Sequence, residues 1–191
     1  MAETAVAPGT SRVSSLLHDL QQLDHALYAA VAATDTPTLD TGLRRLSRAA
    51  DNSKISLTIA ALLALRPGRG RRAALTGVAA VGLASASANL VGKELVRRPR
   101  PDRAAAEVVA DRQVPMPASA SFPSGHTASA VAFAFAVSAG LPAAAVPLFL
   151  LATAVGYSRV HTGVHYPGDV AAGALLGTAC GAAAVALFRS R

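Results

Sequence analysis

Three long stretches without a charged side chain constrain this 191-residue chain more than any other feature. They cover residues 73–92, 127–158 and 170–188 and are 20, 32 and 19 residues long. A helix needs about 20 apolar residues to cross the hydrocarbon core of a bilayer. Because lipid offers the backbone no hydrogen-bond partners, only helices or closed barrels cross it, and no strand pattern competes here. The sequence therefore predicts an all-α, membrane-embedded fold.

The apolar pattern predicts a bundle of about six helices, of which four or five span the membrane. Residues 73–92 are the best single spanning candidate. The longest stretch is interrupted by Gly140-Leu141-Pro142, so we expect two antiparallel helices within 127–157. Residues 39–65 end in an uncharged run that is too short to span alone, and we expect the preceding turns to extend it as one helix.

The N-terminal segment has a different pattern. Apolar residues recur at helical spacing from Leu16 to Val31, with acidic and amide side chains on the other side, which predicts an amphipathic helix over 14–34. Such a helix lies either in the membrane interface or on the bundle. Because Thr36-Pro37 ends it, we divide the chain into a tail with an amphipathic helix (1–35) and a membrane domain (36–191).

Charge is sparse and mainly basic. Only 15% of the residues are charged, and the net charge of +7 comes from 16 Arg and 2 Lys against 11 acidic residues. A soluble domain carries about a quarter charged residues. The excess of Arg fits anionic headgroups or phosphates. We expect no nucleic-acid partner, because aromatic residues make up only 4% and no basic face is interleaved with them.

The last apolar stretch, residues 170–188, contains the pattern Gly173-x-x-x-Gly177-x-x-x-Gly181. Small residues at this spacing allow two helices to approach closely in lipid. Cys180, the single cysteine, lies in the same stretch and is expected to be a small packing residue.

Polar residues gather in three blocks at the ends of the apolar stretches, at residues 93–101, 123–126 and 158–169. Taken singly, they fit a stop-transfer charge cluster, a turn and a polar surface loop. The hairpin 127–157 returns the chain to the side where it started, and residues 73–92 deliver the first block into the loop that contains the second. All three blocks are therefore expected on one membrane face, which favours an active site there.

The second block predicts an anion site at the start of a helix. Pro123 and Ser124 favour a helix start, where free N–H groups and the positive end of the helix dipole attract an anion. Gly125 allows a ligand to approach the backbone, and His126 follows directly.

The third block is rich in histidine. His161, His165 and Asp169 are spaced i, i+4 and i+8, which on an unbroken helix would suggest a metal site. Gly163 and Pro167 interrupt the run, so we expect a loop over about 158–167, which weakens the case for a metal site. Asp169 then lies in the first turn of the next helix, where it can hold one nitrogen of His165 and leave the other free as a nucleophile or base.

Together the blocks resemble the signatures of the type-2 phosphatidic acid phosphatase family, which shares its site with vanadium-dependent haloperoxidases. The family signatures are Lys-x6-Arg-Pro, Pro-Ser-Gly-His and Ser-Arg-x5-His-x3-Asp. This chain has Lys93-x6-Arg100-Pro101, Pro123-Ser124-Gly125-His126 and Ser158-Arg159-x5-His165-x3-Asp169. All three signatures are complete and in order. The resemblance covers about residues 40–190 and is closest to small actinobacterial members.

The resemblance implies a membrane phosphatase that hydrolyses a phosphomonoester or diphosphate of a lipid or isoprenoid through a phosphohistidine, without metal or cofactor. His165 would attack phosphorus, Asp169 would orient His165, and His126 would protonate the leaving oxygen and then help to activate water. The expected phosphate-binding residues are Lys93, Arg100, Ser124, Gly125 and Arg159. Outside the signatures, His161 has no assigned role, and Arg97 and Arg98 are expected to contact headgroups.

The positive charges at the two ends of the predicted bundle favour opposite orientations in the membrane. The loop 66–72 and the C-terminal residues 189–191 lie opposite the three blocks, and their arginines favour cytoplasm on that side. The three blocks carry more Lys and Arg in total, which favours cytoplasm on the side of the blocks. The family tendency is an extracytoplasmic site, so we expect a multi-pass protein of the cell membrane with its site outside.

Three other functions are compatible with the blocks, and one is a metallohydrolase that uses His161, His165 and Asp169. A phosphotransferase would pass the phosphoryl group to an acceptor other than water, and a non-catalytic protein would only bind a lipid. A haloperoxidase is disfavoured, because those enzymes are larger and soluble. The expected partners are a lipid or polyprenyl phosphate substrate and membrane lipids, and the oligomeric state is open.

Overall fold

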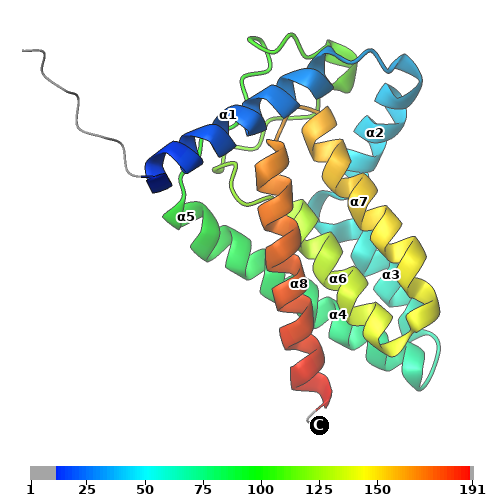
Figure 1. Cartoon of the computed structure of the whole chain (residues 1–191). Coiled ribbons are helices and arrows are strands. Elements are labelled where there is room, and N and C mark those ends of the chain that lie inside the picture. Colours follow the sequence, from blue (N-terminus) through cyan, green and yellow to red (C-terminus); the bar gives the residue numbers. More distant parts are fainter. Residues whose placement is uncertain (1–11, 190–191) are drawn as a thin grey trace, which may run out of the picture.

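The structure, a computed structural model, describes residues 12–189 (Figure 1). The tail expected at 1–13 lies almost wholly outside the described residues. Within 12–189 the chain forms seven principal helices and no strand. These are α1 (Arg12–Ala33), α2 (Pro37–Ala49), α3 (Lys54–Ala64), α4 (Arg69–Ala86), α6 (Gly125–Gly140), α7 (Ala145–His161) and α8 (Pro167–Arg189). The all-α bundle expected from the sequence is confirmed.

Short helical segments join these elements. A 3₁₀ turn at Asp51–Ser53 separates α2 from α3, and a second at Pro142–Ala144 lies between α6 and α7. α4 continues through a π-helical segment (Ser87–Gly92) into α5 (Lys93–Leu95), so that one apolar helix runs over Arg69–Leu95. π-helical turns are found frequently at functional sites, and this one ends at Lys93.

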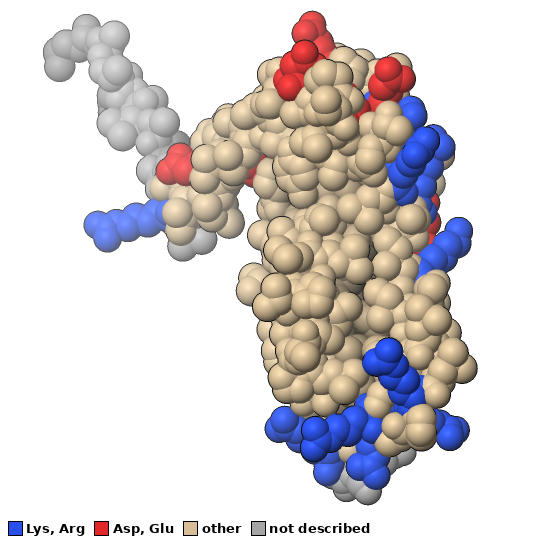
Figure 2. Space-filling view, turned by 90° about the vertical axis from the view of Figure 1, so that its right-hand side faces the viewer, with Lys and Arg blue, Asp and Glu red and all other residues tan. Residues whose placement is uncertain are grey.

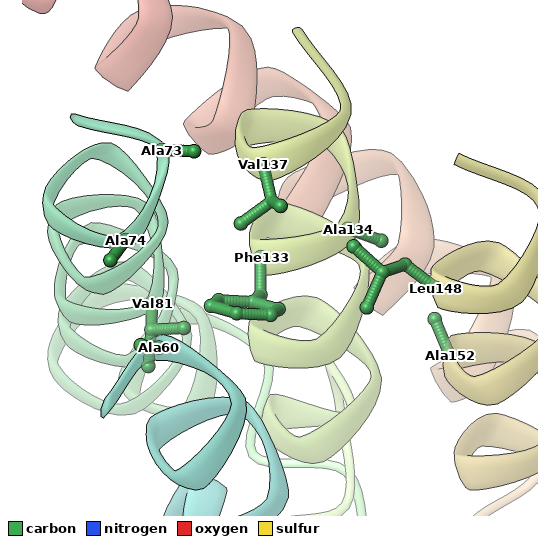
Figure 3. Packing of buried hydrophobic residues seen from close by; sticks show 9 residues of the cluster. All are labelled: Ala60, Ala73, Ala74, Val81, Phe133, Ala134, Val137, Leu148 and Ala152. Carbon is green, nitrogen blue, oxygen red and sulfur yellow. The ribbon is translucent and has the colours of Figure 1, made fainter. Parts of the chain in front are cut away.

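Helix α6 occupies the centre of the bundle and packs on α4, α7 and α8 (Figure 1). Phe133 of α6 points between α4 and α3, while Leu148 and Ala152 of α7 pack on the other side of α6 (Figure 3). Most of the remaining core consists of alanine, which lets the helices approach closely.

The glycine pattern of α8 makes the closest of these contacts. A Cβ at Gly173 would lie 2.5 Å from the carbonyl oxygen of Ser124, and one at Gly177 would lie 2.4 Å from that of Ala128. Because no real Cβ approaches a backbone oxygen so closely, only glycine allows α8 to lie this near to α6. The structure thus confirms the packing role predicted for this pattern, and it brings the start of α8 beside the start of α6.

Three of the described helices are long and apolar enough to cross a membrane: Arg69–Leu95, Pro142–His161 and Pro167–Arg189. Helices α3 and α6, with 11 and 16 residues, are shorter than the roughly 20 residues of an independent span. Both lie among longer helices, since α6 is surrounded by α4, α7 and α8 and α3 packs on α4.

Two expected boundaries are wrong. Residues 39–65 do not form one helix, because Asn52 and Ser53 adopt left-handed backbone angles (φ 54° and 57°) that break the chain between α2 and α3. The third block does not begin as a loop at residue 158, because α7 continues to His161. Arg159 and His161 therefore project from the last turn of α7, and the loop is limited to residues 162–166.

The two ends of the bundle differ in charge. Lys and Arg gather at the end that carries the α3–α4 turn and the C-terminus of α8 (Figure 2). Arg69, Arg72 and Arg189 line a hollow there, and Arg66 and Arg71 are exposed beside them. The opposite end holds α1, the turn after α7 and the long connection between α5 and α6 (Figure 1).

Candidate active site

The three polar blocks meet around a cavity of about 190 Å³ at the end of the bundle that carries α1. Lys93 and Arg100 come from the end of α4–α5 and the connection that follows, Gly125 and His126 from the first turn of α6, and His165 from the loop before α8. The prediction that the blocks share one face is therefore confirmed by the arrangement of the helices.

His165 lies between a carboxylate and a guanidinium. Its Nδ1 is 3.4 Å from Oδ2 of Asp169, and its Nε2 is 3.4 Å from an Nη of Arg100. A guanidinium can only donate hydrogen bonds, so the Nε2 lone pair accepts from Arg100 and the ring proton lies on Nδ1, toward Asp169. Nε2, on the side of the ring that faces Arg100, is thus the unprotonated nitrogen.

The environment of His165 keeps the imidazole neutral. The side chain is 2% exposed, and burial, with the nearby Arg100 charge acting in the same direction, lowers the pKa of His165 to about 4. The hydrogen bond to Asp169 opposes this shift but does not cancel it. A neutral imidazole whose Nε2 carries no proton is the form that can act as a nucleophile.

Asp169 is fully buried and is held by three further groups. Oδ1 accepts from Arg98 at 2.9 Å, while Oδ2 accepts from the backbone N–H of Tyr166 at 2.9 Å and from the hydroxyl of Ser121. These contacts fix the carboxylate behind His165. The prediction for Arg98 is wrong: it lies half-buried between two carboxylates and does not extend to headgroups.

His126 has its own carboxylate partner. Oδ1 of Asp51 lies 2.9 Å from Nε2 of His126. The same oxygen is 3.6 Å from an Nη of Arg159. Asp51 lies at the kink between α2 and α3, directly before the left-handed residues Asn52 and Ser53. Two histidines with separate carboxylates thus lie on one cavity.

Arg159 is buried at the end of α7, with 2% of its side chain exposed. One Nη donates to the backbone oxygen and the hydroxyl of Ser47, at 3.2 and 2.7 Å. Its Nε has no hydrogen-bond partner among the described residues. A buried N–H without an acceptor is costly, and a phosphoryl oxygen would supply one.

Lys93 and Arg100 are positioned by the connection between α5 and α6. Nζ of Lys93 donates to Oδ1 of Asn89 at 2.6 Å and to the hydroxyl of Ser119 at 3.0 Å. Arg100 donates to the carbonyl oxygens of Ser119 and Val164, at 2.8 and 2.7 Å. Its remaining N–H groups lie near Nε2 of His165, the hydroxyl of Ser119 and the carbonyl oxygen of Ala120, at 3.4, 3.4 and 3.2 Å. Both cations line the cavity, and Lys93 keeps a third ammonium N–H beyond these contacts.

Ser124 and Gly125 form the start of α6 as predicted, with different exposure to the cavity. The Ser124 hydroxyl caps the helix by accepting from the backbone N–H and hydroxyl of Thr127, at 3.4 and 3.0 Å, and the residue is fully buried. Gly125 lines the cavity, whereas Ser124 is not among the lining residues. The phosphate-binding role of Ser124 stays a prediction.

His161 belongs to a different cluster. Its Nε2 lies 3.0 Å from Oδ1 of Asp40, which also accepts from Nε of Arg112 at 2.9 Å. Arg112 in turn donates to carbonyl oxygens at the end of α1, including that of Thr34 at 2.6 Å. This buried cluster ties α1, α2 and the α5–α6 connection to the end of α7. Within residues 12–189 no group of three or more His, Cys, Asp or Glu side chains is arranged to hold a metal ion.

The sequence did not indicate three of the residues that support the site. Asp51 lies outside the signatures in a segment expected to be helical, and Ser121 is one of several serines in a loop. Arg98 was taken for a surface cation. The only sequence signal for Asp51 is its place in Asp51-Asn52-Ser53, a run of turn-forming residues inside an otherwise helical pattern.

Comparison with known proteins agrees with this geometry. The family model described as PAP2 superfamily matches residues 73–191, which include all three blocks. The chain belongs to the PAP2 superfamily. The resemblance stated from the motifs is therefore confirmed, and Asp51 lies before the part of the chain that the PAP2 model matches.

Individual PAP2 relatives extend the match. A decaprenylphosphoryl-5-phosphoribose phosphatase of Mycobacterium tuberculosis is 39% identical over 153 residues, covering 79% of this chain and 81% of the relative. The crystal structure of Aquifex aeolicus LpxE superposes with a TM-score of 0.70 at 27% identity, covering 86% of this chain and 95% of that one.

A second solved structure shares the fold. It is described as the first transmembrane PAP2 type phosphatidylglycerolphosphate phosphatase from Bacillus subtilis, with a TM-score of 0.71 at 23% identity, and the match covers 90% of this chain and 87% of that one. Together these matches show a PAP2 membrane phosphatase that acts on a phosphate ester of a lipid or isoprenoid.

Proposed function

We propose that this protein removes the terminal phosphate of a polyprenyl-phosphoryl sugar phosphate, with His165 as the nucleophile. The observation that carries the proposal is the state of His165: Nε2 is unprotonated, faces Arg100 on the cavity and is backed by Asp169 through Nδ1. A phosphoryl group in this cavity would lie between the nucleophile and the cations that neutralise its oxygens.

The reaction would proceed in two balanced steps. In the first, Nε2 of His165 attacks phosphorus, the bond between phosphorus and the leaving oxygen breaks, and the imidazolium form of His126, paired with Asp51, gives that oxygen its Nδ1 proton and becomes neutral. In the second, His126 takes a proton from water, the hydroxide attacks the phosphohistidine, and the phosphorus–nitrogen bond breaks to release inorganic phosphate. The hydrogen bond from Nε2 of His126 to Asp51 leaves Nδ1 as the nitrogen for both proton transfers.

The cations on the cavity would carry the charge of the transition state. Lys93 and Arg100 line the cavity, and Arg159, buried 3.6 Å from the Asp51 carboxylate that pairs with His126, has an unpartnered Nε–H. Fixed donors of this kind stabilise the phosphoryl oxygens as the bonds to phosphorus loosen. The N–H groups at the start of α6, including that of Gly125, would add further donors.

The surroundings of the cavity support a substrate larger than a bare lipid phosphate. A wider hollow of about 820 Å³ adjoins the cavity and shares Lys93, Arg100 and Ser119 with it. Such a hollow has room for a sugar between the lipid and the phosphate. The relative named as acting on decaprenylphosphoryl-5-phosphoribose supports the same substrate class.

The proposed location is the cell membrane, with the cavity on the extracytoplasmic side. The arginines at the opposite end support this orientation, because Arg69, Arg72 and Arg189 on short connections and helix ends favour the cytoplasm. At the other end, Lys93 and Arg100 line the cavity and Arg159 is buried, so these cations contribute less to an orientation signal.

The test is a phosphate-release screen of the purified protein in the presence of a chelator. The substrates are prenyl phosphates, prenyl-phosphoryl sugar phosphates, phosphatidic acid and phosphatidylglycerol phosphate, with His165→Ala as the blank. We expect the highest kcat/KM for the prenyl-phosphoryl sugar phosphate and inhibition by vanadate. Full release by His165→Ala, or loss of activity on chelation, would overturn the mechanism. Equal rates for all lipids would overturn the substrate class.

A further inference from the structure

Helix α1 crosses the end of the bundle that carries the candidate active site (Figure 1). One of its side chains contacts the groups that hold Asp169 beside His165, the two residues called the catalytic pair below. Oδ2 of Asp24 lies 2.7 Å from an Nη of Arg98, and Oδ1 accepts from the backbone N–H of Gly168 at 2.6 Å. Arg98 uses its other Nη to bind Asp169 at 2.9 Å. Asp24 is therefore joined to the carboxylate behind His165 through one guanidinium.

A second route leads from α1 to the same carboxylate. The ring of Tyr166 lies between the guanidinium of Arg98, 4.1 Å from the ring centroid, and the imidazole of His25, stacked at 4.8 Å. Tyr28 of α1 packs edge-on against the same ring at 5.4 Å. The backbone N–H of Tyr166 donates to Asp169. Both routes hold the turn between α7 and α8 in the conformation that sets Asp169 behind His165.

The leucines of α1 are exposed. Leu16, Leu17, Leu20, Leu23 and Leu27 expose 57, 61, 53, 55 and 48% of their surface. Five exposed leucines on one helix form a larger apolar face than a soluble protein normally leaves in water. The spanning segment Pro142–His161 ends at the level of these leucines, and Pro167–Arg189 begins there. This level corresponds to the headgroup region of a bilayer.

The leucine face continues into a hollow between α1 and the bundle. About 610 Å³ in volume, it is lined mainly by apolar side chains, including Leu27 and Val31 of α1, Phe149 of α7 and Val170 of α8. An apolar hollow that opens toward lipid suits an acyl or prenyl chain passing beneath the helix.

We infer that α1 is a lipid-docked positioning helix: its leucines bind the membrane interface, and Asp24 fixes the catalytic pair through Arg98 and Gly168. The occupant of the leucine face is the headgroup and upper acyl region of the bilayer in which the bundle is embedded. Asp24 is a positioning residue, because it contacts Asp169 only through other groups. The inference rests on the proposed role of His165 and Asp169, and it assigns function to a helix that precedes the PAP2 match.

The first test is a comparison of Asp24→Asn with Asp19→Asn in nanodiscs. Both substitutions remove one carboxylate from α1, but the side chain of Asp19 is exposed and takes no part in the network. We expect Asp24→Asn to lower kcat about tenfold with KM nearly unchanged, because a misplaced catalytic group slows chemistry without weakening binding. Asp19→Asn should match the wild type. Equal effects of the two variants would overturn the positioning role.

A double variant separates positioning from a merely structural contact. If Asp24 acts through Arg98, then Asp24→Asn added to Arg98→Gln should lower kcat no further than Arg98→Gln alone. If the double variant instead loses kcat by the product of the two single-variant losses, Asp24 does not act through Arg98. The melting temperature of each variant is measured in parallel, and a loss of activity that follows the unfolded fraction would also count against positioning.

The second test measures the depth of α1 directly. A fluorophore is attached at Leu20→Cys in a Cys180→Ala background, and its quenching by brominated lipids is compared with quenching by iodide in water. We expect strong quenching by lipids brominated near the headgroup and weak quenching by iodide. The reverse would overturn membrane docking. Because this readout needs no turnover, it stays valid if the proposed phosphatase chemistry fails, and wild-type phosphate release tests that chemistry separately.

Discussion

The carboxylate of Asp51 accepts a hydrogen bond from Nε2 of His126 at 2.9 Å, and 3.6 Å separates the same oxygen from Arg159. The contact repeats, for the proposed proton donor His126, the arrangement that Asp169 provides for His165. It also brings the α2–α3 turn, which precedes the PAP2 match at 73–191, into the candidate active site.

Removing this carboxylate should impair protonation of the leaving group. We expect Asp51→Asn to lower kcat on an alkyl phosphate about 10²-fold, since general acid catalysis contributes 10²–10⁴-fold. The loss should be much smaller on p-nitrophenyl phosphate, whose leaving group needs no proton. Asp111→Asn, at a largely exposed carboxylate, is the control. Equal losses on the two substrates would show that Asp51 does not act through the proton donor.

The pH profile should report the buried His165. Its pKa is lowered from an ordinary 6.5 to about 4, mainly by burial, so the nucleophile is neutral at every pH above about 4. The acidic limb of kcat/KM, which reports the free enzyme, should therefore lie near pH 4. The substrate phosphate loses its second proton near pH 6, which also affects kcat/KM. This substrate pKa is measured separately, and the pH profile of kcat/KM is corrected for it. A corrected limb near pH 6.5 would contradict the environment described for His165.

The contact between α6 and α8 should tolerate no added carbon at Gly177. A Cβ there would meet the backbone of Ala128 and the side chain of Val131. We expect Gly177→Ala to destabilise the protein by about 1–3 kcal/mol, the usual range for overpacking. Gly82→Ala is the matched control, because nothing lies within 4 Å of a Cβ at Gly82. Thermal unfolding in detergent measures both, and a variant Gly177→Ala as stable as Gly82→Ala would contradict the packing.

The buried cluster of Asp40, Arg112 and His161 should matter for stability more than for turnover. Arg112→Leu leaves Asp40 without its guanidinium partner, and breaking a buried pair in this way costs about 3–5 kcal/mol. We expect a large fall in melting temperature for Arg112→Leu. For His161→Gln we expect kcat per folded molecule within about twofold of the wild type. A loss of activity in His161→Gln as large as that of His165→Ala would place His161 in the chemistry.

How far the sequence predicts this structure depends on the kind of signal. Uncharged length predicted the spanning helices, because lipid leaves the backbone few alternatives. The Gly173–Gly177–Gly181 pattern predicted the α6–α8 contact, because close approach depends on those residues alone. The signatures placed His126, His165 and Asp169 together, since each block follows or precedes a helix whose direction is fixed by its neighbours.

The remaining features depend on contacts between distant segments, which a linear pattern does not encode. Arg98 is one of several arginines in a basic run, and only the fold shows that it lies between Asp24 and Asp169. The break at Asn52 and Ser53 escaped prediction because no glycine or proline marks the left-handed residues in the sequence. His161 and His165 appear equivalent in spacing, yet α7 continues far enough to turn His161 toward Asp40.

The most direct test of the account is to trap the phosphoryl group on the enzyme. The protein is mixed with substrate labelled in its terminal phosphate and quenched in alkali, where phosphohistidine is stable and phosphoserine esters are lost. We predict a burst of about one label per enzyme on the peptide that contains His165, with no label in His165→Ala. Label on another residue, or a full burst in His165→Ala, would contradict the assignment of His165 as the nucleophile.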